Sequence, residues 1–101
     1  MTLKHFIGRK VIVRTYSAGV WFGALEEKDG NEVILADARR LWYWGAKDGI
    51  SLSAVAVHGV IHEKSRIPGS VEKVWLEAIE IIPATDAATA SLEGAPHATA
   101  E

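Results

Sequence analysis

The sequence predicts a mainly β, α+β domain: a small, strongly bent antiparallel sheet or a partly open barrel of the SH3-like or Sm-like kind, with one or two short helices. Three observations predict it. Short runs rich in β-branched residues alternate between apolar and polar side chains, Gly-containing turns separate these runs, and a long alternating run returns near the end of the chain. With 101 residues, we expect a single β-rich domain over residues 1–92 and a flexible tail over residues 93–101.

The first two strands are predicted from the N-terminal third of the chain. The run KVIVRTY (Lys10–Tyr16) alternates and is rich in Val and Ile, which is typical of a half-buried strand. A turn at Ser17–Gly19 follows, and VWFGALEEK (Val20–Lys28) is predicted to be the second strand. A glycine inside a strand marks a bulge or a close approach of two backbones, so Gly23 is predicted to be such a point.

A tight hairpin and two further strands are predicted next. Asp29-Gly30 is expected to supply the two positive φ angles that a type I′ hairpin requires. Asn31–Ala38 is predicted as the third strand and Arg39–Trp44 as the fourth, with a bend at Asp37. The strand period of two then places the last six residues on opposite faces: Arg39, Leu41 and Tyr43 on one, and Arg40, Trp42 and Trp44 on the other.

The second half of the chain predicts helix, loop, strand and helix. Ser51 is a good N-cap and Gly59 a good C-cap, which favours a short helix between them. His62–Ser70 is predicted to be a polar loop, and Val71–Pro83 a long final strand that bends round the sheet. Thr85 is expected to cap a last helix that ends at Leu92. On the long strand, the period of two places Val74, Leu76 and Ala78 on one face and Trp75, Glu77, Ile79 and Ile81 on the other.

Composition and spacing exclude several classes of function. There are no cysteines, which rules out disulfides and thiolate chemistry, and the pair His58 and His62 is interrupted by Gly59. We therefore expect no metal site and no cofactor. No glycine-rich phosphate loop or nucleophile elbow is present, so the chain is not expected to be an enzyme. A net charge of −2 disfavours binding of long nucleic acid. No apolar run is long enough for a membrane span, and we expect a cytoplasmic protein.

A binding surface for a small nucleotide is the remaining prediction. Arginine pairs with phosphate, and aromatic rings stack on nucleobases. Surface aromatic side chains and exposed sheet edges also favour a homo-oligomer. The alternative is that Trp42 and Trp44 pack in the core or a subunit interface while the arginines pair with acidic residues. The candidate ligand-binding residues are Arg14, Tyr16, Ser17, Arg39, Arg40, Trp42, Tyr43, Trp44, Lys64 and Arg66.

The stretch VIVRTYSAGVWFGALEEKDGNEVILADARRLWYW, with SLSAVAVHGV and EAIEIIPAT, resembles a family of small phage and prophage proteins, and the resemblance extends to about Leu92. It implies an anti-defence sponge that binds cyclic oligonucleotide signals of bacterial CBASS immunity in the infected host's cytoplasm. Such a sponge is a non-enzymatic oligomer with pockets at subunit interfaces. Trp21 departs from the histidine or other polar residue expected in relatives, which implies a change in the base that fits. Two other functions stay open: an Sm-like RNA-binding or regulatory module, and a structural or assembly protein with an aromatic interface.

Overall fold

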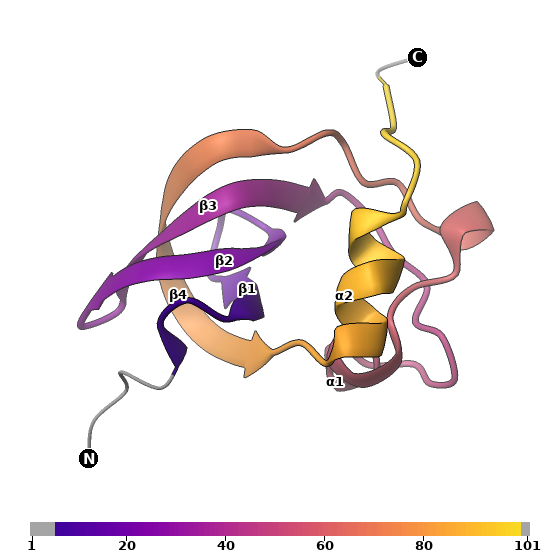
Figure 1. The fold of residues 1–101 in the computed structure, drawn as a ribbon, viewed down its shortest axis with the longest axis horizontal. Coiled ribbons are helices and arrows are strands. Elements are labelled where there is room, and N and C mark those ends of the chain that lie inside the picture. The colour runs from indigo at the N-terminus through magenta and orange to yellow at the C-terminus, as the bar shows by residue number, and fades with distance from the viewer. Residues whose placement is uncertain (1–5, 100–101) are drawn as a thin grey trace.

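A computed structural model describes residues 6–99 and contains a four-stranded antiparallel sheet that curves into a ring (Figure 1). The strands are β1 (Lys10–Thr15), β2 (Val20–Asp29), β3 (Glu32–Leu41) and β4 (Val71–Pro83). The first half of β4 pairs with β3 and its second half pairs with β1, which closes the ring. The predicted fold class, a mainly β and barrel-like domain with short helices, is confirmed.

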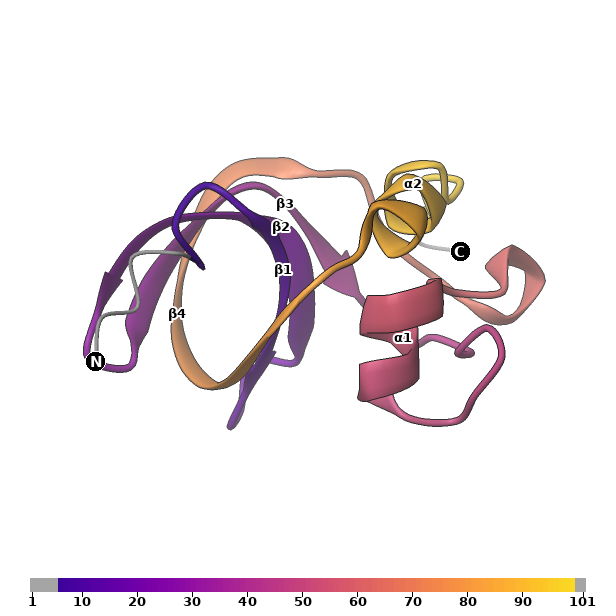
Figure 2. The same ribbon diagram turned by 60° about the horizontal axis from the view of Figure 1, so that its bottom comes forward.

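Two short α-helices lie together at one side of the ring (Figure 2). They are α1 (Leu52–His58) and α2 (Asp86–Glu93), and a 3-10 turn, η2 (His62–Lys64), follows α1. As predicted, the Ser51 hydroxyl accepts a hydrogen bond from the Ala54 amide at the start of α1, and the Thr85 hydroxyl accepts one from the Ala88 amide. None of the helices within residues 6–99 is long and apolar enough to cross a membrane.

The hydrophobic residues form two clusters, one inside the ring and one between the ring and the helices. Val11 and Val13 belong to the inner cluster, whereas Ile12 belongs to the cluster that includes the helix residues Val55 and Leu92. The helices thus cover the outer face of β1, so this strand is buried on both faces from Val11 to Val13 instead of half-buried as predicted. The members of the inner cluster are Val11, Val13, Trp21, Leu25, Val33, Leu35, Ala38, Leu76 and Ala78.

A bulge bends the sheet at Gly23, as predicted from the sequence. The register between β2 and β3 shifts there, and a Cβ atom on Gly23 would lie 2.9 Å from the carbonyl oxygen of Ala36. The extra residue lies on β3, where Asp37 has a φ of 49°. β3 continues through this bend and ends at Leu41, so the prediction of a separate fourth strand over Arg39–Trp44 is wrong. A bulge changes the direction of a strand without ending its pairing.

The β2–β3 hairpin differs from its prediction in one backbone angle. Asp29 pairs with Glu32, so the two central residues of the turn are Gly30 and Asn31. Only Gly30 has a positive φ, of 60°, and Asp29 does not. The prediction of two positive φ angles at Asp29-Gly30 is therefore wrong. A glycine with positive φ at the first central position is what a type II′ turn requires.

A second register shift changes which way the end of β4 faces. Arg14 pairs with Glu80 whereas the next residue of β1, Thr15, pairs with Ala78, so Ile79 is an extra residue on β4. Beyond this bulge the two faces of β4 exchange. Ile81 therefore packs against the inner cluster, and its predicted place on the same face as Trp75 is wrong.

The segment after α2 packs against the rest of the domain. Ala95 is 4 % exposed, and the Ala98 amide donates a hydrogen bond of 3.0 Å to the carbonyl of Ile67. His97 forms a parallel bridge with Ile67. A flexible tail over residues 93–101 was expected from the sequence, whereas residues 95–98 make these contacts with the domain. Residues 100 and 101 lie outside the described residues.

Candidate functional site

Arg39 is a structural residue and has no donor free for a ligand. It is only 4 % exposed, and burial lowers the pKa of its guanidinium from the ordinary value. All five of its N–H donors reach backbone carbonyls, so its predicted role in ligand binding is wrong. The acceptors are the carbonyl oxygens of Ile67 (2.8 Å), Pro68 (2.9 Å), Leu92 (2.7 Å), Ala95 (3.0 Å) and Pro96 (3.5 Å).

Arg40 stacks on Trp21 and is tied to the β1–β2 turn. Its guanidinium carbon lies 4.4 Å from the centre of a Trp21 ring, which is a cation–π contact. Its Nη1 donates to the Ala18 carbonyl at 2.9 Å, and the Trp21 indole N–H donates to the same carbonyl at 3.0 Å. Trp21 is 6 % exposed and belongs to the inner cluster. It is a core residue, not the ring expected to alter the fit of a base.

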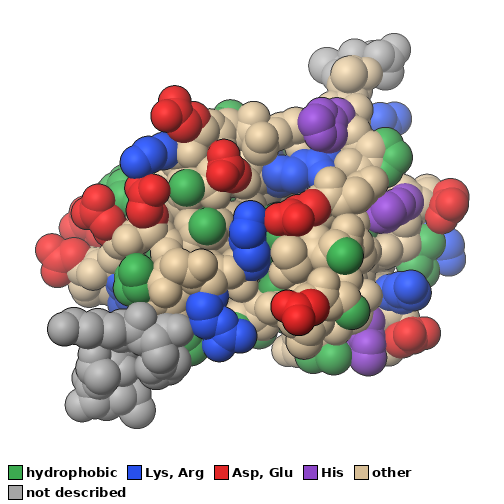
Figure 3. Space-filling model, in the orientation of Figure 1, with side chains coloured by type: hydrophobic (Ala, Val, Ile, Leu, Met, Phe, Trp, Pro, Cys, Tyr) green, Lys and Arg blue, Asp and Glu red, His purple; other side chains and the backbone are tan. Residues whose placement is uncertain are grey.

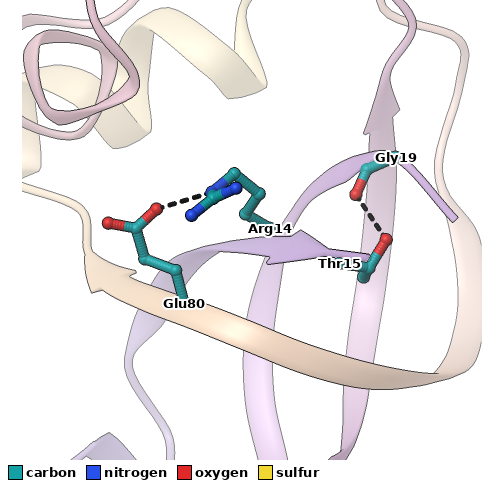
Figure 4. A network of polar contacts seen from close by, with 4 residues as sticks. All are labelled: Arg14, Thr15, Gly19 and Glu80. Atoms are coloured by element: carbon teal, nitrogen blue, oxygen red, sulfur yellow. Dashed lines mark hydrogen bonds and ion pairs between the residues drawn. The ribbon is translucent and has the colours of Figure 1, made fainter. Parts of the chain in front are cut away.

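The Thr15 side chain closes the β1–β2 turn through two hydrogen bonds, of which the one to Gly19 is drawn in Figure 4. The Thr15 hydroxyl donates to the Gly19 carbonyl at 2.8 Å and accepts from the Ala18 amide at 2.8 Å. Because the Ala18 amide is bonded within the turn, it does not contribute to an anion-binding nest. Tyr16, 89 % exposed, and Ser17 lie at the exposed tip of this turn.

Thr15→Val is expected to lower the free energy of unfolding by about 1–2 kcal/mol, because the valine keeps the shape of the side chain and removes both hydrogen bonds of a residue that is 8 % exposed. Urea denaturation measures the change. Ser17→Ala is the control, since Ser17 is exposed, and its effect is expected to stay within about 0.5 kcal/mol. Equal effects of the two substitutions would contradict this account of the turn.

Arg14 lies beside β4 and its charge is already paired. Its Nε donates to a Glu80 carboxylate oxygen at 2.8 Å, and both side chains are partly exposed to solvent (Figure 4). The two residues are direct cross-strand neighbours in the β1–β4 pair. This contact agrees with the alternative in which the arginines pair with acidic residues instead of binding a ligand.

Tyr43 and Arg66 are held side by side, which is the strongest convergence among the predicted site residues. The Arg66 amide donates to the Tyr43 carbonyl at 2.8 Å, and the Trp42 and Tyr43 amides donate to the Arg66 carbonyl at 3.0 and 3.4 Å. Trp42 is 69 % exposed and Tyr43 is 52 % exposed. Tyr43 and Arg66 form an antiparallel bridge, so the backbone of the loop that contains Arg66 lies against the aromatic stretch.

A depression of about 250 Å³ lies beside this pair of segments. Its volume is somewhat below the range of about 300–1,000 Å³ that is typical of pockets for small ligands. Most of its lining could not be predicted from the sequence, because it comes from η2, from the residues that follow η2 and from the C-terminal segment that Arg39 holds in place. The lining residues are Tyr43, His62, Glu63, Ser65, Arg66, Ile67, Ala95, Pro96 and Ala98.

The remaining predicted residues differ in their surroundings. Lys64 is exposed and packs beside Gly45, where an added Cβ would lie 3.0 Å from the Lys64 Cβ. Trp44 is partly buried and packs against the hydrophobic cluster between the ring and the helices. This agrees with the alternative in which Trp44 packs in the core. Of the predicted site residues, one exposed ring, Tyr43, and one cation, Arg66, line the depression; Trp42 and Lys64 are exposed and are not part of its lining.

The His62 ring contacts the backbone of α2. The His62 Nε2 lies 2.9 Å from the Ser91 carbonyl oxygen, and His58 is the last residue of α1. Within residues 6–99, no three His, Asp or Glu side chains gather in a way that suits a metal ion.

Comparison of the chain with curated proteins and with solved structures finds no match. A family model described as a domain of unknown function, DUF6948, matches residues 8–92. The matched stretch includes the whole barrel, α1 and all of α2 except its last residue. The chain therefore belongs to the DUF6948 family.

Proposed function

We propose that this protein binds a small nucleotide at the depression beside Tyr43 and Arg66 and holds it without converting it. The observation that supports this most directly is the pairing of the Trp42–Tyr43 segment with Arg66 through three main-chain hydrogen bonds, with Tyr43 and Arg66 both lining the depression. Aromatic stacking suits a base, and a guanidinium suits a phosphate. Few other classes of small ligand use both chemistries at once.

The ligand that the phage resemblance favours is a cyclic oligonucleotide immune signal, and sequestration is then the whole function. A sponge needs a rigid site and high affinity, because it must bind below the working concentration of the signal. The backbone pairing of the Tyr43 and Arg66 segments supplies part of this rigidity. A depression of about 250 Å³ accommodates one base of such a ligand, and a second protomer would have to hold the rest.

Isothermal titration with a panel of cyclic di- and trinucleotides tests the proposal. Tyr43→Ala is expected to weaken binding by about 5- to 100-fold, which corresponds to the loss of one stacked base, and Arg66→Ala by a similar factor. Tyr43→Phe keeps the ring and is expected to retain most of the affinity. Arg9→Ala is the charge-matched control, since Arg9 is exposed and its carbonyl bonds to Leu25 in the barrel, away from the depression.

Three results would overturn the proposal. The first is no heat of binding with any nucleotide of the panel. The second is binding to single-stranded RNA with a steep salt dependence, which indicates many phosphate contacts and an RNA-binding module. The third is an oligomer that dissociates in Trp42→Ala while no nucleotide binds, which indicates a structural protein with an aromatic interface. A native mass spectrum of freshly purified protein reports the stoichiometry and any retained nucleotide.

A further inference from the structure

A second surface, far along the sheet from the nucleotide depression, combines an exposed tryptophan with unpaired carboxylates. It lies on the outer face of the barrel near the β2–β3 hairpin, where acidic side chains gather at the left end of Figure 3. The strand register places two rows of side chains across β2, β3 and β4. We call this surface the acidic face; its rows are Glu27, Ile34 and Trp75, and Asp29, Glu32 and Glu77.

The row of three carboxylates is unfavourable for the isolated domain. Asp29 is opposite Glu32, and Glu32 is opposite Glu77, and like charges directly opposite one another destabilise a sheet. None of these three residues, nor Glu27, takes part in the ion pairs formed within residues 6–99. The nearby Lys28 ammonium donates to the Gly30 carbonyl at the hairpin turn. An external cation would offset this repulsion.

The carboxylates in this region also raise the pKa of a neighbouring lysine. A hydrogen bond from Lys73 to Glu26 raises the pKa of the Lys73 ammonium, and the charges of Glu26, Glu72 and Glu27 raise it further. The Lys73 Nζ lies 2.7 Å from Glu26. The acidic face thus borders on a lysine that the surrounding carboxylates already stabilise in its charged form.

Trp75 presents a large apolar ring among these carboxylates. Its side chain is 55 % exposed, and its indole N–H donates to a Glu32 carboxylate oxygen at 3.0 Å. This bond orients the ring and leaves the other Glu32 oxygen available. A depression of about 270 Å³ adjoins the ring and is lined by Glu27, Lys28, Asp29, Glu32, Val33, Ile34 and Trp75.

From this juxtaposition we propose that the acidic face docks an arginine side chain of a basic segment on a partner protein. A guanidinium is planar and weakly hydrated, so it stacks on an indole ring and pairs with carboxylates at its edge. The depression has room for one long side chain. Within residues 6–99, a metal ion is not favoured, because no three acidic or His side chains converge on one point.

A partner protein is favoured over a second copy of this chain because most of the chain's own arginines are engaged. Arg39 is buried, Arg14 is paired with Glu80, and Arg40 stacks on Trp21. Arg66 lines the depression beside Tyr43. This docking site uses none of the residues of that site, so the two proposals succeed or fail independently.

The experiment is a titration of the full chain with a capped tetra-arginine peptide at low ionic strength. Calorimetry measures the affinity, and the indole N–H resonances in NMR spectra report which tryptophan is affected. The Trp75 resonance is expected to shift. Trp75→Ala is expected to weaken binding by about tenfold, and Glu32→Gln by about fivefold. Glu63→Gln makes the same change in net charge on η2 and is expected to stay within about twofold of the unmodified protein. Circular dichroism confirms that each variant is folded.

A capped tetra-citrulline peptide has the same shape as the tetra-arginine peptide and no charge, and it is expected not to bind. Equal binding of the two peptides would overturn the proposal, as would equal affinities in Trp75→Ala, Glu32→Gln and Glu63→Gln. Sedimentation velocity gives the remaining test. A dimer that dissociates in Trp75→Ala, together with no peptide binding, would assign the acidic face to a second copy and would also overturn the proposal.

Discussion

Arg39→Met is expected to lower the free energy of unfolding by about 3–4 kcal/mol. Methionine replaces much of the apolar stem but removes five charged hydrogen bonds to backbone carbonyls. These carbonyls belong to two segments, one before β4 and one at and after the end of α2. Without the Arg39 donors these buried carbonyls have no hydrogen-bond partner, and a buried acceptor without a partner lowers stability by its full desolvation penalty. Urea denaturation followed by tryptophan fluorescence measures the change.

The adjacent residue supplies the control for this prediction. Arg40→Met removes one hydrogen bond and one cation–π contact from a partly exposed side chain, and about 1 kcal/mol is expected. In Arg39→Met, the Ala98 amide, bonded to Ile67 in the native protein, is also expected to lose its protection from hydrogen exchange. Equal destabilisation by the two substitutions would contradict the structural role assigned to Arg39.

Gly59→Ala is expected to cost about 3 kcal/mol of stability, for two separate reasons. Gly59 has φ 93° and ψ −157°, a region of backbone conformation that is almost restricted to glycine. An added Cβ would also lie 2.4 Å from both the Cβ and the Oγ of Ser91 on α2. The Ser91 hydroxyl accepts a hydrogen bond of 3.0 Å from the Val60 amide, so it cannot move without breaking this link between α2 and the segment that follows α1. Thermal or urea unfolding measures the loss.

Gly30→Ala separates the two reasons. Gly30 also has a positive φ, of 60°, but no atom lies within 4 Å of an added Cβ. Its substitution is expected to cost about 1 kcal/mol, from backbone strain alone. If Gly59→Ala costs no more than Gly30→Ala, the close packing of α1 against α2 at Gly59 is not a determinant of stability.

The structure brings together fewer of the predicted ligand-binding residues than the sequence pattern indicates. Ten residues were expected to converge on one ligand, and the structure brings only Tyr43 and Arg66 to one depression. Arg39 and Arg40 have the same charge and adjacent positions, yet one is buried and the other stacks on Trp21. An alternating pattern assigns them to opposite faces and says nothing about what covers each face.

The sequence by itself determined the features that depend on near neighbours: the alternation that forms β1 and β4, the capping residues Ser51 and Thr85, and the bulge at Gly23. The strands and caps follow from interactions within a few residues of the chain, and the glycine inside a strand pattern marks where β2 approaches β3 closely. Only the tertiary structure decided the burial of Arg39, because its acceptors lie 28 to 57 residues away. It also decided the reversal of faces at Ile79, since a register shift depends on how β4 pairs with both β3 and β1. Such contacts depend on the closed ring as a whole, and no local pattern of residue types encodes them.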